Sequence, residues 1–347
     1  MEIWLAILLL IVGFVCLVKG ADWFVDGAAG IAAKLRVPQL IIGLTIVSFG
    51  TSAPELATSI ISSAQGSADI AVGNVIGSNI TNILLILGLA AVICPLDVQK
   101  SARHFDLPVL LGASVLILFF GLNNNQIDRW EGWIMFLISL AYMGFLIYIA
   151  IKESKKQGGM SELNENSLDT SHTVAVFEKD GETEEKKGFS AWYEKMKAHT
   201  WFLCVITVLG LALVVVGALY AVIPSATAIA EKLGVPEKII GLTIVAIGTS
   251  LPELVTCVIA ARKGETDIAV GDIVGSNIFN IIRTLGISAM ILPLAFEASF
   301  LIDGLIALGA AAFLAILGYM KGHKVRRWGG IVMLLAFATY YVYLFAM

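Results

Sequence analysis

Two glutamates, Glu55 and Glu253, lie in apolar stretches that are otherwise uncharged. Each ends a short motif, GTSAPE at residues 50–55 and GTSLPE at residues 248–253. Proline removes a backbone N–H and clashes with the preceding turn, and glycine adds backbone freedom, so both motifs predict a broken helix. Because a lone carboxylate within an apolar span is costly, we expect both glutamates to face a partner, water or an ion.

The two motifs also supply uncharged oxygen atoms. Four hydroxyls adjoin the glutamates, those of Thr51, Ser52, Thr249 and Ser250. The breaks are further expected to free backbone carbonyls, such as those of Ser48 and Ala246, for cation binding. Unpaired backbone at membrane depth is tolerated only inside the protein or beside a wet cavity, which favours a site between helices.

Two further apolar segments carry a polar stripe at helical spacing. The positions i, i+4 and i+8 hold Asn74, Ser78 and Asn82 in one segment, and Asp272, Ser276 and Asn280 in the other. Residues spaced in this way share one face of a helix. The ordinary alternative is hydrogen bonding between helices beside close-packed glycines, and it applies most to Asn74 and Asp272.

Together these groups describe an all-oxygen site for hard cations. Calcium takes six to eight oxygen ligands in flexible geometry, and two carboxylates neutralise one divalent ion. The same oxygens suit several sodium ions, so two substrates would compete for shared ligands, as an antiporter requires. The sequence contains no nucleophile–base pair and no metal motif. We therefore predict no enzyme, no catalytic or cofactor-binding residue and no cofactor, with calcium and sodium as substrates.

The composition agrees with a membrane location. Of 347 residues, 58% are hydrophobic and 14% are charged, against about a quarter charged in soluble proteins. This excludes a soluble enzyme, a disordered chain and a nucleic-acid-binding protein. Ten segments reach the roughly 20 apolar residues that a bilayer span needs. They are 3–33, 39–64, 69–95, 106–122, 130–151, 201–231, 237–261, 268–294, 299–319 and 328–346.

The distribution of lysine and arginine predicts the orientation. Residues 152–199 form the longest polar connection, and they share their side of the membrane with most of the basic loop residues. The positive-inside rule places this connection in the cytoplasm. With ten spans both termini then lie outside, and the plasma membrane, the inner membrane of the cell, is the expected location.

An internal repeat organises the chain. Residues 37–96 align without a gap with residues 235–294, and 35 of the 60 positions are identical. We predict an all-α membrane protein with a first five-helix repeat at 1–151, a cytoplasmic loop at 152–199 and a second repeat at 200–347. Because five spans is an odd number, the second repeat is inverted, an architecture typical of secondary transporters.

The motif pairs GTSAPE with GSNITN and GTSLPE with GSNIFN resemble the two alpha-repeats of sodium/calcium exchangers, in the cation/calcium antiporter superfamily, prokaryotic type. The resemblance implies that calcium and about three sodium ions use one central cluster of sites at the midplane. It also implies that the long first and sixth helices slide across a rigid core. The implied ligands are Glu55, Glu253, Thr51, Thr249, Ser52, Ser250, Ser78, Ser276, Asn82 and Asn280, with the carbonyls of Ser48 and Ala246.

Three residues depart from the expected pattern. Asn280 stands where some relatives have aspartate, which favours a potassium-independent exchanger. Asp272 differs from its counterpart Asn74 and is placed at the entrance of the site. Arg283 replaces the counterpart Leu85 and, at i+7 from Ser276, points along the polar stripe. It is expected either to pair with a buried carboxylate or to perturb the cation site.

We therefore predict an antiporter that brings about three sodium ions in for each calcium ion expelled, by alternating access. Other couples on the same fold stay open, namely proton/calcium, potassium-dependent exchange or another divalent cation. A non-transporting cation sensor or scaffold and a passive channel are rivals from other classes. The expected partners are the two ions and the lipid bilayer, with no nucleic acid, and the protein is expected to function as a monomer.

Overall fold

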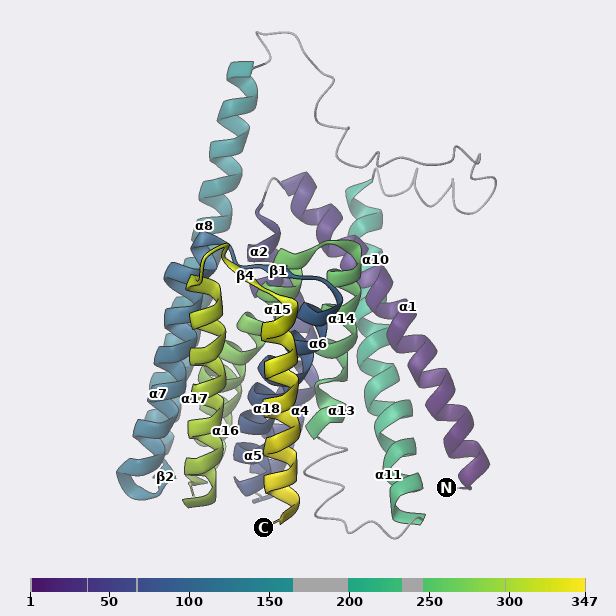
Figure 1. The fold of residues 1–347 in the computed structure, drawn as a ribbon, viewed down its shortest axis with the longest axis vertical. Helices are drawn as coiled ribbons and strands as arrows, with labels where there is room; N and C mark the ends of the chain where they lie inside the picture. Colours follow the sequence, from purple (N-terminus) through teal and green to yellow (C-terminus); the bar gives the residue numbers. More distant parts are fainter. Residues whose placement is uncertain are drawn as a thin grey trace.

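The computed structural model describes residues 2–35, 37–66, 68–164, 199–232, 246–296 and 298–346. They form a nearly all-helical bundle (Figure 1). The first half contains α1 (Ile3–Leu35), α2 (Gln39–Ile42), η1 (Gly43–Val47), α3 (Ser48–Thr51), α4 (Ala53–Ala64), α5 (Ala68–Ile80), η2 (Thr81–Leu87), α6 (Gly88–Ile93), η3 (Ala102–Asp106), α7 (Leu107–Asn124) and α8 (Arg129–Asn164). The second half contains α10 (Thr200–Val216), η4 (Gly217–Val222), α11 (Ile223–Lys232), α13 (Ala246–Thr249), α14 (Leu251–Lys263), α15 (Thr266–Phe279), η6 (Asn280–Leu285), α16 (Gly286–Ile291), α17 (Ala298–Tyr319) and α18 (Arg327–Ala346). The η elements are π-helical turns that continue the neighbouring α-helices.

The helices follow the predicted spans closely. Among the described residues, eight helices are long and apolar enough to cross a membrane, or up to nine if the bent pair Gln39–Thr51 and Ala53–Ala64 is one span. Residues 237–245 of the seventh predicted span lie outside the described residues, so the count of ten remains a prediction. The start of α1 and the end of α18 lie at the same end of the bundle, and α8 ends at the opposite one (Figure 1).

The predicted polar connection at residues 152–199 begins as helix, because residues 152–164 continue α8. This stretch is rich in lysine and glutamate, which are good helix formers although they are too polar for a membrane span. Residues 165–198 lie outside the described part of the chain.

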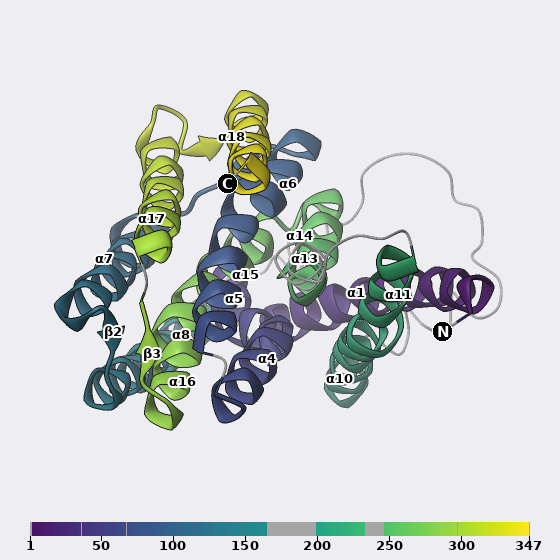
Figure 2. The same ribbon diagram turned by 90° about the horizontal axis from the view of Figure 1, so that it is seen from below.

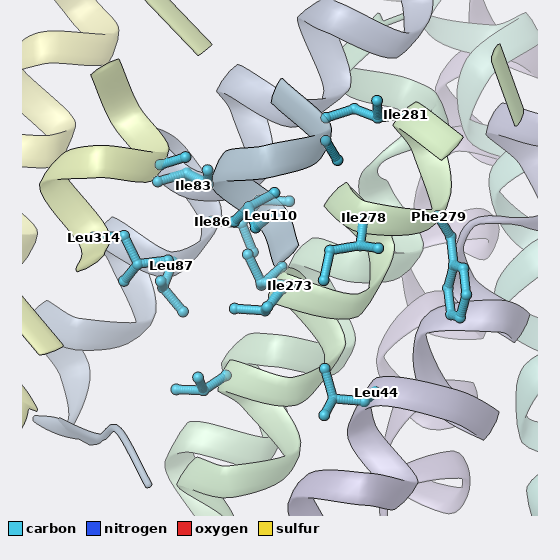
Figure 3. Close-up of a cluster of buried hydrophobic side chains, with 14 of the residues drawn as sticks. Leu44, Ile83, Ile86, Leu87, Leu110, Ile273, Ile278, Phe279, Ile281 and Leu314 are labelled. Carbon is cyan, nitrogen blue, oxygen red and sulfur yellow. The ribbon is translucent and has the colours of Figure 1, made fainter. Parts of the chain in front are cut away.

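The outer surface of the bundle is apolar. Phe119, Val208 and Trp4 are 65%, 65% and 64% exposed, and many other large hydrophobic side chains lie outward. A soluble protein rarely exposes so much contiguous apolar surface, so this surface faces lipid. Inside the bundle, side chains from η1, η2, α7, α15 and α17 form a buried apolar cluster (Figure 3). The chain is a multi-pass membrane protein.

Helix α1 touches α10 and its continuation η4 along a line of glycines, which we call the glycine seam: Gly13, Gly20 and Gly27 on α1, with Gly210 on α10 and Gly217 at the start of η4. The spacing of seven residues keeps each set on one face of its helix. A Cβ atom added at Gly20 would lie 2.7 Å from the Gly210 carbonyl oxygen. Glycine therefore lets the two backbones meet directly. Figure 2 shows α1, α10 and α11 together on one flank of the bundle.

Two short antiparallel strand pairs connect the halves, which the prediction of an all-helical fold did not include. Strand β1 (Leu96–Asp97) pairs with β4 (Lys324–Val325), and β2 (Gln126–Ile127) pairs with β3 (Leu294–Ala295). The offset of 198 residues converts β1 into β3 and β2 into β4. Each half thus contributes the same two strands, and each strand pairs with a strand of the other half.

Candidate cation-binding site

Both glutamate motifs break their helices as predicted. Ser52 separates α3 from α4 with φ −79° and ψ 9°, and Ser250 separates α13 from α14 with φ −84° and ψ 6°. The first break bends the helix by 45°. Pro54 and Pro252 each stand in the first turn of the helix that follows, where a missing N–H costs little.

The two breaks meet through reciprocal hydrogen bonds. The Ser52 hydroxyl donates to Oε1 of Glu253 at 3.0 Å, and the Ser250 hydroxyl donates to Oε1 of Glu55 at 3.0 Å. All four side chains have no exposed surface. The two glutamates therefore share one buried region, and each is held by a serine from the other half of the chain.

The polar stripes of α5 and α15 face the breaks in the same reciprocal way. Thr51 Oγ1 lies 3.0 Å from Oδ1 of Asp272, and the Thr249 hydroxyl donates to Oδ1 of Asn74 at 3.3 Å. Asp272 is completely buried. The expectation that Asp272 lies at the entrance of the site is wrong, because its carboxylate contacts a threonine of the break itself.

Six of the predicted ligand side chains each keep at least one oxygen with no hydrogen-bond partner among the described residues. They are Oε2 of Glu55 and Glu253, Oγ of Ser78 and Ser276, and Oδ1 of Asn82 and Asn280. These six side chains are all fully buried. Buried polar atoms normally have partners. Two carboxylates, two hydroxyls and two amides form the donor set that calcium and sodium prefer.

The two predicted backbone ligands are the carbonyl oxygens of Ser48 and Ala246. The sequence predicts that the break frees the Ser48 carbonyl, but this oxygen accepts a hydrogen bond from the Ser52 N–H at 3.1 Å. A carbonyl oxygen has two lone pairs, so it can still ligate an ion with the second one. Ala246 begins α13, at the position equivalent to Ser48. The role of both carbonyls remains a prediction.

Two asparagines at the centre of the bundle were missed. Nδ2 of Asn79 donates to the Asn277 carbonyl and Nδ2 of Asn277 donates to the Asn79 carbonyl, both at 3.2 Å. Asn277 Oδ1 also accepts from Nδ2 of Asn82 at 3.0 Å. These bonds tie α5 to α15, which lie together in the middle of Figure 2. The sequence contains a signal for this pair, because asparagine occupies equivalent positions in both GSN motifs.

Among the described residues, Arg283 does not pair with a carboxylate, and its effect on the cation site stays a prediction. In the part of the chain that the structure describes, its guanidinium forms no ion pair, and its three nitrogens have no hydrogen-bond partner. It lies instead 4.1 Å from the ring centroid of Phe49 and 4.9 Å from that of Phe279. Arg283 lies within the π-helical turn η6, where residues do not follow the period of 3.6 residues per turn that the i+7 spacing assumes.

We expect Arg283→Leu to increase the apparent calcium affinity by several-fold to about tenfold. The substitution removes a buried positive charge from the helix that carries Ser276 and Asn280, and charges interact strongly across a low-dielectric interior. Leucine is the residue at the equivalent position 85. The measurement is calcium uptake against calcium concentration in vesicles. Arg283→Lys keeps the charge and is the control, and equal affinities in all three proteins would contradict the expectation.

Comparison with known proteins relates this geometry to a family. A family model described as sodium/calcium exchanger protein matches residues 5–148 and again residues 202–346. The chain is 36% identical over 360 residues to the sodium/calcium exchanger MaX1 of Methanosarcina acetivorans, covering 97% of this chain and 98% of the relative. It is 39% identical over 290 residues to the inner membrane protein YrbG of Escherichia coli, covering 83% and 81%.

A solved structure is similar throughout its length. The sodium-calcium exchanger NCX_Mj, soaked with 10 mM sodium and 10 mM strontium, superposes with a TM-score of 0.77 and 28% sequence identity. The match covers 97% of this chain and 98% of the exchanger. The same arrangement of helices therefore occurs in a protein that was solved in the presence of sodium and a divalent cation.

Proposed function

The chain belongs to the sodium/calcium exchanger protein family, and we propose that it exchanges sodium for calcium by alternating access at the buried glutamate pair. Sodium enters the cell and calcium leaves it. With about three sodium ions per calcium ion, each cycle carries one net positive charge inward, which yields about 2.3 kcal/mol per 100 mV. Calcium and sodium are the substrates, and no resident cofactor is needed.

The observation that carries this proposal is the reciprocal bonding of Ser52 with Glu253 and of Ser250 with Glu55. It brings two carboxylates into one region without exposed surface, beside hydroxyl and amide oxygens that have no partner among the described residues. The ligands in this proposal are Glu55, Glu253, Thr51, Thr249, Ser52, Ser250, Ser78, Ser276, Asn82 and Asn280, together with the Ser48 and Ala246 carbonyls. Because the site is buried, ions reach it only through a conformational change. Movement of α1 with α10 past the remaining helices supplies that change.

The arrangement in the membrane completes the proposal. The chain functions as a monomer in the plasma membrane, with two inverted halves at residues 1–151 and 200–347. Both termini lie outside the cell, and the connection that begins after α8 lies in the cytoplasm. Two features support this arrangement: the family model matches the chain twice, and the start of α1 and the end of α18 lie at one end of the bundle.

The test uses the purified chain in sealed vesicles loaded with sodium. We expect rapid calcium uptake when the external medium lacks sodium, and no uptake above background when sodium is equal on both sides. An inside-positive potential should accelerate uptake, because the exchange carries net positive charge out of the vesicle. A rate of calcium uptake that does not depend on the sodium gradient would contradict sodium coupling. A rate that does not depend on the membrane potential would contradict the three-to-one ratio.

A further inference from the structure

The polar stripes of α5 and α15 differ in chemical type at one of their three positions. Serine and asparagine recur at 78 and 276 and at 82 and 280, but the amide of Asn74 is replaced by the carboxylate of Asp272. The two side chains are similar in size. The difference is therefore one of charge and of hydrogen-bond donors.

Asn74 uses both ends of its amide. Its Oδ1 accepts from Thr249 at 3.3 Å. Its Nδ2 donates to the backbone carbonyl of Glu55 at 3.2 Å and to the Ser59 hydroxyl at 3.0 Å. In the first half, the stripe therefore donates hydrogen bonds to two acceptors on α4.

Asp272 reproduces only the first of these contacts. Its Oδ1 lies 3.0 Å from Thr51 Oγ1, but its Oδ2 is buried and has no hydrogen-bond partner among the described residues. The group equivalent to the Glu55 carbonyl is the Glu253 carbonyl, another acceptor. The group equivalent to Ser59 is Cys257, whose thiol lies 3.8 Å from the Ala269 carbonyl instead. The second half thus has a carboxyl oxygen where the first half has an amide N–H donor.

No positive side chain compensates this charge within the described ranges. Arg283 lies eleven residues along the same helix, about 16 Å away by the helical rise, and rests on two aromatic rings. Lys263 pairs with Asp22 at 2.5 Å and with Asp26 at 2.8 Å. A buried carboxylate without a counter-charge is strongly unfavourable, so Asp272 needs either a proton or a bound cation to balance it.

We propose that Asp272 binds a monovalent cation, at a site in the second half that has no equivalent in the first. The ligands from this half are Oδ2 of Asp272 and, one turn further along the stripe, the buried Ser276 hydroxyl, which has no partner among the described residues. One carboxylate with neutral oxygens balances a single positive charge. A divalent ion at the same place would keep one positive charge unbalanced. That the cation is sodium rests on the proposed function.

The experiment is calorimetric titration of sodium into the purified full-length chain. Calcium is chelated, and choline replaces sodium at constant ionic strength. We expect Asp272→Asn, which makes the second stripe match the first, to bind one sodium ion fewer or to bind sodium about tenfold more weakly. Asn74→Asp introduces the equivalent negative charge in the first half, beside Thr249. We expect this variant to bind one sodium ion more than the wild-type chain. Melting temperature and gel filtration establish that each variant is folded.

Calcium–calcium isotope exchange in vesicles is the second readout, because it needs the glutamates but no sodium. Asp272→Asn should lose more of its sodium–calcium exchange than of its calcium–calcium exchange, whereas Glu253→Gln should lose both. Sodium binding by Asp272→Asn with wild-type stoichiometry and an affinity within twofold would overturn the proposal. A wild-type chain that exchanges no calcium would refute the proposed function, yet its sodium titration would still decide the Asp272 site. If Asp272→Asn does not fold, an unchanged sodium count in Asn74→Asp overturns the proposal.

Discussion

Glu55→Gln and Glu253→Gln are each expected to reduce sodium-driven calcium uptake by about 100-fold or more. Even residues that only orient a metal ligand contribute about 10–100-fold to affinity, and these carboxylates are the only charged ligands proposed for calcium. Glutamine has nearly the same shape and keeps a carbonyl oxygen, so the bonds from Ser250 and Ser52 can persist. The loss is therefore expected in transport and not in folding. Initial rates of calcium uptake in vesicles measure it.

Glu131→Gln is the matched control. Glu131 is also completely buried, but its Oε2 accepts from the Asp128 N–H at 2.8 Å at the start of α8, far along the chain from both breaks. Its replacement should leave the rate of uptake within about twofold, because glutamine retains one acceptor for that bond. If Glu55→Gln or Glu253→Gln transported calcium as fast as this control, ligation by the pair would be wrong.

Gly210→Ala is expected to separate α1 from α10 and to stop transport. A Cβ atom at this position would lie 2.6 Å from both the Gly20 carbonyl oxygen and the Phe24 nitrogen. Both neighbours are backbone atoms, which cannot rotate away, so the helices must move apart. Overpacking of this kind costs about 1–3 kcal/mol of stability. Thermal unfolding in detergent and calcium uptake in vesicles measure the two effects.

Gly30→Ala tests the same helix without the backbone clash. The nearest atoms to its added Cβ are the terminal carbons of the Leu203 side chain, at 2.7 and 3.0 Å, and a leucine side chain can adjust. We expect near-normal melting and uptake. Equal behaviour of the two alanine variants would show that direct backbone contact in the glycine seam is unimportant.

The repeat in the sequence made most of the site predictable. Because the GTSAPE and GTSLPE motifs are equivalent, both were expected to break a helix at the same depth, and Ser52 and Ser250 do separate the helices there. The i, i+4, i+8 stripes likewise lie on the continuous helices α5–η2 and α15–η6, and their first residues, Asn74 and Asp272, contact the breaks. These features depend on local sequence and on helical periodicity, which a single chain shows directly.

Other features depend on how the halves pack. The direction of Arg283 could not be predicted from a period of 3.6 residues per turn, because Arg283 lies in a π-helical turn. Such a turn is not visible in the pattern of residue types. The pairing of β1 with β4 and of β2 with β3 joins residues more than 160 positions apart in the chain. The contact of Asp272 with Thr51 also joins the two halves, so the sequence around Asp272 alone does not reveal it.

The reciprocal serine–glutamate bonds have a consequence for the biogenesis of the protein. Synthesis proceeds from the N-terminus, so α4 is made and inserted before Ser250 has been translated. Until then the Glu55 carboxylate lacks the hydroxyl that holds it in the finished protein. A half-made chain holds only half of the proposed ligands. If the serine–glutamate pair binds ions as proposed, ion binding begins only when the second half has inserted, and a bound ion then stabilises the completed protein.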